Sequence, residues 1–377
     1  MKVPFYTGAV SFKRQWPLIA AKLDQILDQG LFTNGPVVKE LERAMETFTG
    51  AKHAIAVGNA TEALVIMLKA AGIGPGDEVI VPSFTFFASA SSIVHAGAVP
   101  VFCDIDPVTY MLKPDELEDK VTARTKAIMP VHLFTQMADM KAICEIAEKH
   151  GLLVLEDSAE AISMFHEGKH AGIVGQAGVI SFFPTKTLGA IGDAGLILTN
   201  RDDLAARARL LRLHGQEEDE PYVHHLVGTN SRMDDIQAAV LLARLQYLPS
   251  EIAKRSHWAT LYDRLLADLP QVQTPHIRVR EEAANPVYYV YLIEAEQRDE
   301  LVEYLSEQGI GTETYYPIPL HLQPCFSHLG YEPGSMPHAE HACSRTVGLP
   351  MYPDLQEADV RAVCEAIRKF YESGGEG

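Results

Sequence analysis

Short apolar runs recur along the first two thirds of the chain. They are rich in Val, Ile and Phe and too short for helices, so they predict buried strands. The runs cover residues 78–86, 98–106, 126–134, 151–160, 178–186 and 195–200. Helical patterns lie between several of them. One begins at a capping Asn59 and stops at Gly72; a second, over residues 137–151, places four apolar side chains on one face, namely Met140, Ile143, Ile146 and Ala147.

Buried strands that alternate with helices indicate an α/β fold, in which a mostly parallel sheet is covered on both faces. The pattern changes after residue 245. A strand-like run over residues 286–294 is preceded by a helical pattern at residues 252–269 and followed by helical patterns at residues 298–309 and 357–372. We therefore predict a large domain over residues 1–245, which includes an N-terminal helical segment, and a smaller α+β domain over residues 246–377.

The composition excludes several classes of function. Of the 377 residues, 47% are hydrophobic, and 32 basic against 50 acidic residues give a formal net charge of −18. This balance argues against general affinity for nucleic acid or anionic membranes. The N-terminal stretch lacks the apolar core of a signal peptide, and no uncharged run approaches the length of a membrane span. We expect a cytoplasmic protein.

The cysteines and clustered histidines do not indicate a metal site. The 5 cysteines are scattered without CxxC spacing, so we expect neither a disulfide framework nor a zinc ribbon. His338, His341 and Cys343 are close in sequence, but helical spacing sets only the two histidines on one face. That pattern is typical of the start of a surface helix.

Candidate chemistry lies where the predicted strands end, because ligands of such sheets bind beyond the carboxyl ends of the strands. A lysine amine can condense with an aldehyde, and a fixed carboxylate can keep a pyridine nitrogen protonated. Lys186 and Asp157 thus meet two requirements of pyridoxal 5'-phosphate (PLP), and the polar turn at residues 58–64 opens onto a helix that could bind its phosphate. The strand-end candidates are Ser83 to Phe87, Asp104, Asp106, His132, Glu156 to Glu160, Thr185 and Lys186.

Each of these signals has a simpler interpretation. A strand-end lysine is usually a solvated charge, and Asp157 or Ser158 could cap the next helix. Asn59 and Thr61 could likewise be caps only. Taken together, a turn, a carboxylate and a lysine on successive strand ends are better explained by a PLP site than by three unrelated structural roles.

Ordered motifs along the chain also carry a family resemblance. The chain resembles the DegT/StrS-type (DegT/DnrJ/EryC/StrS) nucleotide-sugar aminotransferases, which are PLP enzymes of fold type I. The resemblance implies a large domain with a mostly parallel, seven-stranded sheet covered by helices, and a smaller C-terminal α+β domain. The motifs are FTNGPVVKELERAM, VGNATEAL, GPGDEVIVPSFTF, FCDIDPVTY, VLEDSAEA, SFFPTKTLGAIGDAG, HGQ, VGTNSRMDDIQAA, YYPIPLHLQP and VGLPMYPDL.

The resemblance implies roles for residues around the cofactor. Lys186 would be the Schiff-base lysine and the general base and acid, while Asp157 would pair with the pyridine nitrogen. Phe86 would lie against the face of the ring. The phosphate would be held by residues of both subunits of a homodimer, namely Ala60, Thr61 and Ser181 of one subunit and Asn230 of the other.

Two further features concern the lysine motif and the aspartate motif. Glycines 189, 192 and 195 suit a chain that turns tightly beside a cofactor, which needs permissive backbone angles and room. Three residues after the aspartate, where the family usually has Gln or His beside the cofactor's phenolic oxygen, this chain has Glu160. Because a carboxylate facing a phenolate is repulsive, we expect Glu160 to be protonated or turned toward a cation.

The implied reaction is a transamination in two halves, from L-glutamate to the keto carbon of a nucleotide-linked sugar, for glycan or natural-product biosynthesis. The wording of the lysine region favours a 3-keto sugar, because 4-keto members usually carry an acidic Gly-Glu-Gly-Gly turn. Lys186 argues against a sugar dehydratase, because dehydratases of this type typically have a histidine in place of the lysine. A 4-keto sugar, a keto-cyclitol, and a non-catalytic binding or regulatory role remain as alternatives. Substrate contacts implied by the resemblance are Asn34, Arg232, Tyr315, Tyr316 and His321.

Overall fold

A seven-stranded sheet forms the centre of the molecule, with strand order β1-β9-β8-β5-β4-β2-β3. The computed structural model describes residues 2–277 and 286–374. Strand β9 runs antiparallel to β1 and β8, and the other neighbouring strands pair in parallel, which confirms the predicted mostly parallel sheet. The strands are β1 (His53–Val57), β2 (Glu78–Pro82), β3 (Val99–Cys103), β4 (Thr125–Ile128), β5 (Leu153–Asp157), β8 (Ala177–Ser181) and β9 (Gly195–Thr199).

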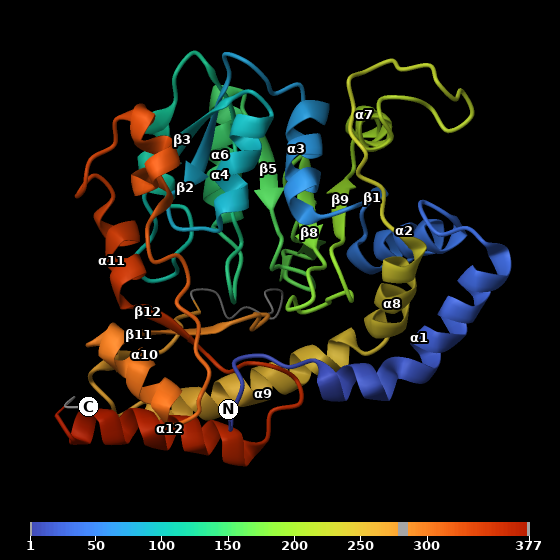
Figure 1. Cartoon of the computed structure of the whole chain (residues 1–377). Helices are drawn as coiled ribbons and strands as arrows, with labels where there is room; N and C mark the ends of the chain where they lie inside the picture. Colours follow the sequence, from blue (N-terminus) through green and yellow to red (C-terminus); the bar gives the residue numbers. More distant parts are fainter. Residues whose placement is uncertain (1, 278–285, 375–377) are drawn as a thin grey trace.

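Both faces of this sheet are buried, as the continuous apolar runs predict. Successive side chains of a strand point to opposite faces, so Ile55 and Val57 of β1 join one apolar cluster while Ala54 and Ala56 join another. Figure 1 shows helices α3, α4 and α6 lying against the strands. The helices within the first 245 residues are α1 (Ala9–Gln29), α2 (Pro36–Thr49), α3 (Ala60–Ala70), α4 (Phe87–His95), α5 (Leu117–Lys120), α6 (Met140–His150), α7 (Asp202–Arg212) and α8 (Asp235–Leu245).

The two helices predicted in detail form as expected. The Asn59 side chain caps α3 by accepting a hydrogen bond from the Glu62 backbone N at 2.8 Å. The C-terminal end of α6 lies at Gly151, whose φ of 66° is left-handed. Three of the four apolar residues assigned to its inner face are buried and the fourth is half-buried, in the order Met140, Ile143, Ala147 and Ile146.

The C-terminal part has a sheet of its own, made of β10 (Val272–Gln273), β11 (Tyr291–Ala295) and β12 (Thr346–Leu349). Strand β11 is shorter than the predicted run at residues 286–294, whose first part lies outside the sheet. Val3 pairs with Ile310 and belongs to the apolar cluster of this sheet, so the chain begins against its C-terminal part. The helices here are α9 (Leu248–Leu266), α10 (Arg298–Glu307), α11 (Pro337–Arg345) and α12 (Glu357–Glu372).

Short elements complete the structure: strands β6 (Phe165–His166) and β7 (Lys169–His170) and 3₁₀ helices at Pro114–Glu116, Leu320–Leu322 and Pro324–Leu329. Between α7 and α8 the chain loops away from the sheet (Figure 1), and there Tyr222 and Val227 are 90% and 94% exposed. We call residues 214–232 the projecting segment. Within residues 2–277 and 286–374, no helix combines the length and the apolar character needed to cross a membrane.

Candidate active site

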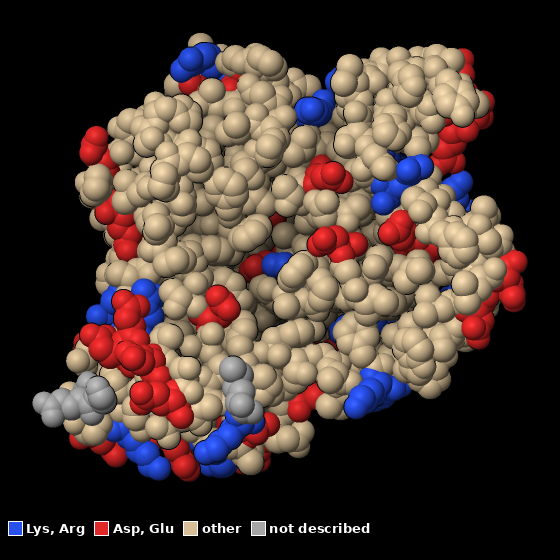
Figure 2. Space-filling model, viewed as in Figure 1, with Lys and Arg blue, Asp and Glu red and all other residues tan. Residues whose placement is uncertain are grey.

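A cavity of about 660 Å³ lies beyond the carboxyl ends of β5 and β8. Figure 2 shows this face hollowed near its centre, with basic and acidic side chains visible inside the hollow. The cavity is also lined by the segment at residues 313–316, which follows α10. Nine residues that the sequence assigned to the site meet in its wall, namely Ala60, Thr61, Phe86, Asp157, Glu160, Ser181, Lys186, Tyr315 and Tyr316.

Lys186 sits in the turn that connects β8 to β9. Its backbone N donates to the Phe183 carbonyl at 2.8 Å, which closes the turn and directs the side chain into the cavity. The Nζ atom lies 2.9 Å from Glu160 Oε1 and 4.3 Å from the centre of the Tyr289 ring. Burial alone would lower the pKa of Lys186, but the charge of Glu160, with smaller effects of Tyr289 and Asp157, holds that pKa above its ordinary value.

The glycines of this turn are needed for room. An added Cβ would lie 2.4 Å from the Pro184 carbonyl oxygen at Gly189, 2.7 Å from the Gln237 amide nitrogen at Gly192, and 2.6 Å from the Asn59 carbonyl carbon at Gly195. None of these glycines has a positive φ. Positive backbone angles are therefore not what these positions require, and the room that they need is against protein atoms: the backbone at Gly189 and Gly195 and the end of the Gln237 side chain at Gly192.

Asp157 is the last residue of β5 and is almost fully buried. Its Oδ2 accepts a hydrogen bond from the Ser89 hydroxyl at 2.7 Å, and its Oδ1 accepts one from the Ala159 backbone N at 3.2 Å. Burial raises the pKa of this carboxyl, while the Ser89 hydroxyl, the Ala159 N–H and Lys186 partly oppose the rise. A desolvated carboxylate of this kind binds a proton donor strongly, so it is suited to pair with a ring N–H group.

The N-terminus of α3 forms one end of the cavity. Ala60 and Thr61 are its first helical residues and line the cavity together with Ser181, the last residue of β8. The first N–H groups of a helix have no partner within the helix, and the helix dipole favours an anion at that position. The close approach of Gly195 to Asn59 sets this helix end directly against the sheet. The arrangement can bind a phosphate group.

Aromatic side chains form another wall. Phe86 is 60% exposed, a large exposed fraction for a Phe side chain, and its ring centre lies 6.5 Å from that of Tyr316. Phe134 stacks on Tyr316 at 6.1 Å between ring centres. Phe134 and Tyr316 have φ values of 60° and 53°, in the left-handed region that bulky residues rarely adopt. Strain of this kind concentrates at functional sites, where the surrounding structure holds it.

Glu160 is turned toward a cation, one of the two states expected from the sequence. One carboxylate oxygen contacts Lys186, and the other accepts a hydrogen bond from the Phe134 backbone N at 2.8 Å. The side chain is 6% exposed. Glu160 thus joins the lysine turn to the loop that follows β4.

Four residues with predicted roles lie outside the cavity. Asn34 donates to Glu218 Oε1 at 3.0 Å, and Arg232 donates from Nε to Asn230 Oδ1 at 2.9 Å, so these three predicted residues lie along the projecting segment or beside it.

His321, the fourth predicted residue outside the cavity, is buried. Its Nδ1 contacts the Ser83 hydroxyl, and its Nε2 lies 3.2 Å from Glu340 Oε1. Since both ring nitrogens are engaged within the fold, His321 joins the loop after β2 to the helix α11.

Other strand-end candidates have structural roles. Asp104 accepts hydrogen bonds from the backbone N of His338 at 3.1 Å and of Ala339 at 2.8 Å, at the start of α11. Glu156 contacts His132 Nε2 at 3.0 Å in the buried core. In the described parts of the chain no group of three or more His, Cys, Asp or Glu side chains is placed to hold a metal ion.

The sequence did not identify several residues of the site. Tyr289, under the lysine amine, belongs to the predicted strand 286–294, where an apolar pattern marked it only as a core residue. Ser89 contacts Asp157 from α4, and serine within a helix gives no signal of such a contact. Phe134 belongs to no obvious motif. Its N–H contact with Glu160 depends on a left-handed backbone conformation, which the sequence does not reveal.

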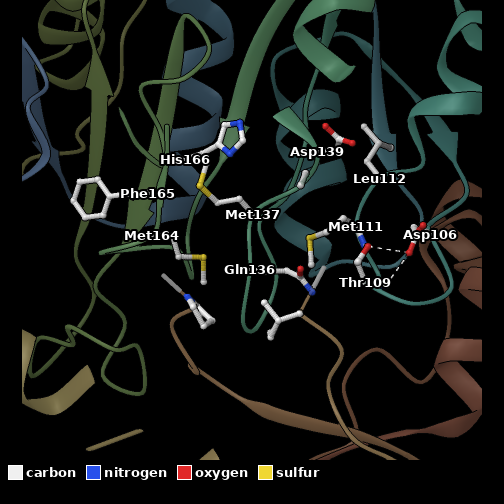
Figure 3. A pocket seen from close by; sticks show the side chains of 13 residues that line it. Asp106, Thr109, Met111, Leu112, Gln136, Met137, Asp139, Met164, Phe165 and His166 are labelled. Carbon is white, nitrogen blue, oxygen red and sulfur yellow. Dashed lines mark hydrogen bonds between the residues drawn. The ribbon is translucent and has the colours of Figure 1, made fainter. Parts of the chain in front are cut away.

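A smaller cavity of about 110 Å³ lies farther along the loop after β4 (Figure 3). Its acidic residues serve local turns. Asp106 accepts hydrogen bonds from the Thr109 backbone N at 2.9 Å and hydroxyl at 3.1 Å, and Asp139 caps α6 by accepting one from Ala142 at 3.1 Å. Most of the remaining lining is apolar, with Met111, Met137 and Met164 pointing inward (Figure 3). We therefore take the larger cavity as the candidate active site.

The chain is similar to known proteins along almost its whole length. The sequence model of the DegT/DnrJ/EryC1/StrS aminotransferase family matches residues 17–368. A pleiotropic regulatory protein of Geobacillus stearothermophilus is 47% identical over 98% of this chain and 99% of its own. A UDP-2-acetamido-2-deoxy-3-oxo-D-glucuronate aminotransferase of Pseudomonas aeruginosa is 41% identical over 95% of this chain and 98% of its own. The crystal structure of S. venezuelae DesV in complex with a ketimine intermediate is 37% identical, with a TM-score of 0.94 over 98% of each chain.

Proposed function

Because the chain belongs to the DegT/DnrJ/EryC1/StrS aminotransferase family, we propose that it transfers an amino group from L-glutamate to the keto carbon of a nucleotide-linked sugar. Membership makes the protein a PLP-dependent aminotransferase of fold type I, as the sequence resemblance predicted. The donor, the position of the keto group and the oligomeric state go further, and they are parts of the proposal.

The residues of the larger cavity fit PLP. Lys186 offers an amine, and the buried Asp157 carboxylate suits a protonated ring nitrogen. Ala60, Thr61 and Ser181 surround the end of α3 at which a phosphate would bind. The exposed Phe86 ring offers a flat apolar surface for a heterocycle.

The observation that carries the proposal is the presence of Lys186 and Asp157 in one cavity, which Phe86 and Tyr316 also line. Bound PLP supplies an aldehyde that condenses with amines and a ring that withdraws electrons. Asp157 holds its negative charge toward the ring nitrogen. Lys186 Nζ, as a neutral amine, would take a proton from the carbon that bears the amino group of the donor. It would then return a proton to the cofactor side of the same C–N bond. Tyr315 and Tyr316 line the same cavity.

A 3-keto sugar is the favoured acceptor. The turn after Lys186 reads TLGAIGDAG and lacks the acidic Gly-Glu-Gly-Gly sequence associated with 4-keto members. The relative from Pseudomonas aeruginosa is named for a 3-oxo nucleotide sugar and is 41% identical. A 4-keto sugar or a keto-cyclitol is the alternative substrate, and binding of a nucleotide would distinguish the cyclitol.

We further propose a homodimer with shared active sites, in which Asn230 of the partner subunit reaches the cofactor phosphate. Asn34, Asn230 and Arg232 lie outside the cavity of their own chain, which suits contacts with the ligand of a second chain. Large apolar side chains are exposed on α1 and beside it, including Trp16 at 54%, Leu27 at 68% and Leu31 at 53%. A surface of this kind is typical of an interface.

A regulatory role is the second candidate function, because the relative from Geobacillus stearothermophilus is named a pleiotropic regulatory protein. Such a role is compatible with PLP binding, but it would not require turnover. The presence of both Lys186 and Asp157 in the cavity favours the enzymatic role.

The absorbance spectrum of the PLP-loaded protein tests the proposal. We expect L-glutamate to convert the band of the bound cofactor to that of its pyridoxamine form. A panel of 3-keto and 4-keto nucleotide sugars is then added, and one 3-keto sugar should restore the first band. Restoration by a 4-keto sugar alone would refute the 3-keto assignment. A cofactor band that changes with no amino acid would support the regulatory role instead.

A further inference from the structure

The ion pair between Lys186 and Glu160 lies inside the cavity, where both side chains are largely removed from water. Glu160 Oε1 is 2.9 Å from Lys186 Nζ, and the exposed fractions of the two side chains are 6% and 15%. An opposite charge at this distance and degree of burial acts much more strongly than it would at the surface. The protonation of the lysine is therefore coupled to this one carboxylate.

The fold fixes the orientation of the Glu160 carboxylate. Its second oxygen accepts a hydrogen bond from the Phe134 N–H at 2.8 Å, and Phe134 is held in a left-handed conformation with a φ of 60°. One oxygen is thus anchored to the backbone and the other is directed at the lysine amine. A side chain that only neutralised the lysine would not need this strained anchor.

Other titratable groups face the pair. Lys186 interacts with Tyr289 and Asp157 as well as with Glu160, and Tyr315 and Tyr316 interact with Glu160. Burial raises the pKa of both Tyr315 and Tyr316, so these phenols stay neutral near pH 7. Asp157 is held by Ser89 and Ala159. Glu160 is therefore the carboxylate placed to exchange a proton with Lys186.

We propose that Glu160 is the proton partner of Lys186, so that the two side chains share one proton whenever the lysine is not covalently linked. An N–H bond of the ammonium group breaks and leaves its electron pair on Nζ, while an O–H bond forms on Glu160 Oε1. The charged pair becomes a neutral amine and a neutral acid. The inference rests on the proposed function, in which Lys186 must alternate between a linked and a free state. The exchange needs no proton from solvent.

Competitive labelling with trace acetic anhydride tests this inference, because the reagent acylates only neutral amines. The full-length protein is stripped of cofactor and labelled over a range of pH, and mass spectrometry compares Lys186 with the exposed Lys126. We expect Lys186 of the wild type to be labelled far less than Lys126 at pH 8. In Glu160→Gln, which has nearly the same shape without the charge, labelling at pH 8 should increase at least about tenfold, the change that one pKa unit produces.

Two further variants make the result specific. Glu160→Asp keeps the charge at a greater distance and should give an intermediate labelling profile. Glu313→Gln removes one negative charge from the same cavity and should leave the profile of Lys186 as in the wild type. A wild-type profile in Glu160→Gln, or in Glu160→Asp if the glutamine variant does not fold, would overturn the inference. Because labelling needs neither PLP nor a substrate, that outcome is separate from a failure of the proposed transamination.

Discussion

The cavity and the projecting segment at residues 214–232 were both assigned to ligand binding, but the structure builds them differently. The cavity residues sit at strand ends, such as Asp157 at the end of β5, and in short turns cross-linked by hydrogen bonds. Residues of the projecting segment are mostly exposed, and Asn230 and Arg232 contact each other there. The first region is assembled by one chain. The second has the properties expected of a surface that is completed by another molecule.

The difference shows where one chain is sufficient to make a site. Parallel strands bring residues distant in sequence to one edge of the sheet, so Thr61, Asp157 and Lys186 meet without help from a partner. The projecting segment leaves the sheet and is not constrained by it in this way. Its position in a single chain therefore does not identify the ligand that it contacts. The following predictions test this division.

Lys186→Ala should cause the largest loss. The variant lacks both the amine that links to PLP and the group that moves the proton, so we expect turnover to fall by more than about 10⁴-fold. Absorbance spectra and a coupled assay with L-glutamate measure the loss. Lys126→Ala, which removes an exposed lysine from β4, is the control and should retain full activity. Substantial turnover by Lys186→Ala would remove the assignment of this cavity.

Mixed subunits test whether the projecting segment serves a second chain. A dimer of one Lys186→Ala subunit and one Asn230→Ala subunit would contain one active site with both native residues. If sites are shared, refolding the two variants together at equal amounts should restore roughly a quarter of the wild-type activity, because half of the dimers are mixed and each has one intact site.

The matched control for that experiment mixes Lys186→Ala with Asp157→Asn, which alter two residues of the same cavity. Because Asp157 and Lys186 line the cavity of the same chain, every mixed dimer then contains two sites with one altered residue each and no native site. That mixture should therefore recover no activity. Wild type refolded with an equal amount of the double variant Lys186→Ala/Asn230→Ala should show roughly a quarter of the wild-type activity if the sites are shared, and roughly half if each chain builds its own site. A mixture with Asn230→Ala that recovers no more activity than the mixture with Asp157→Asn would place Asn230 in the site of its own chain.

Much of the fold was predictable because its signals are local. Apolar runs of strand length marked six strands of the central sheet, and Asn59 marked the start of α3. Strand β1 (His53–Val57) was missed; it is short, and two of its five residues are alanines, which favour strands less than β-branched or aromatic residues do. The mostly parallel arrangement followed from the alternation of strands with helices.

The site was predictable only in part, for physical reasons. Lys186 and Asp157 were found because strand ends gather ligand-binding groups, whereas Ser89 and Tyr289 reach the site from elements that looked purely structural. The contact of Glu160 with the Phe134 N–H requires a left-handed backbone conformation at Phe134. Glycine or asparagine would have indicated such a conformation, but this position is a phenylalanine. Contacts of this kind depend on the tertiary arrangement and not on local sequence.

The smallest expected effect belongs to His321, which lies outside the cavity but supports its wall. The ring bridges Ser83 and Glu340, while the Leu320 N–H donates separately to the Ser83 carbonyl at 2.8 Å. His321→Gln should therefore cost about 1 kcal/mol in the free energy of unfolding, the typical value of one internal hydrogen bond. Activity should fall only a few-fold, since the backbone contact between the two loops remains. A loss as large as that of Lys186→Ala would instead make His321 a direct participant in the reaction.

The pH dependence of stability separates the role of His321 from a general loss of packing. Burial lowers the pKa of His321 from its ordinary 6.5, so the folded protein binds a proton on this ring less readily than the unfolded chain does. The stabilising effect is complete above pH 6.5 and is lost as the pH falls from there toward the lowered pKa of the folded state. Urea unfolding at pH 8, 6.5 and 5 should therefore show a steeper acid loss in the wild type than in His321→Gln. The control His328→Gln alters an exposed histidine and should show the same pH dependence of the free energy of unfolding as the wild type. The same pH dependence in the wild type and His321→Gln would refute a neutral, buried His321 ring.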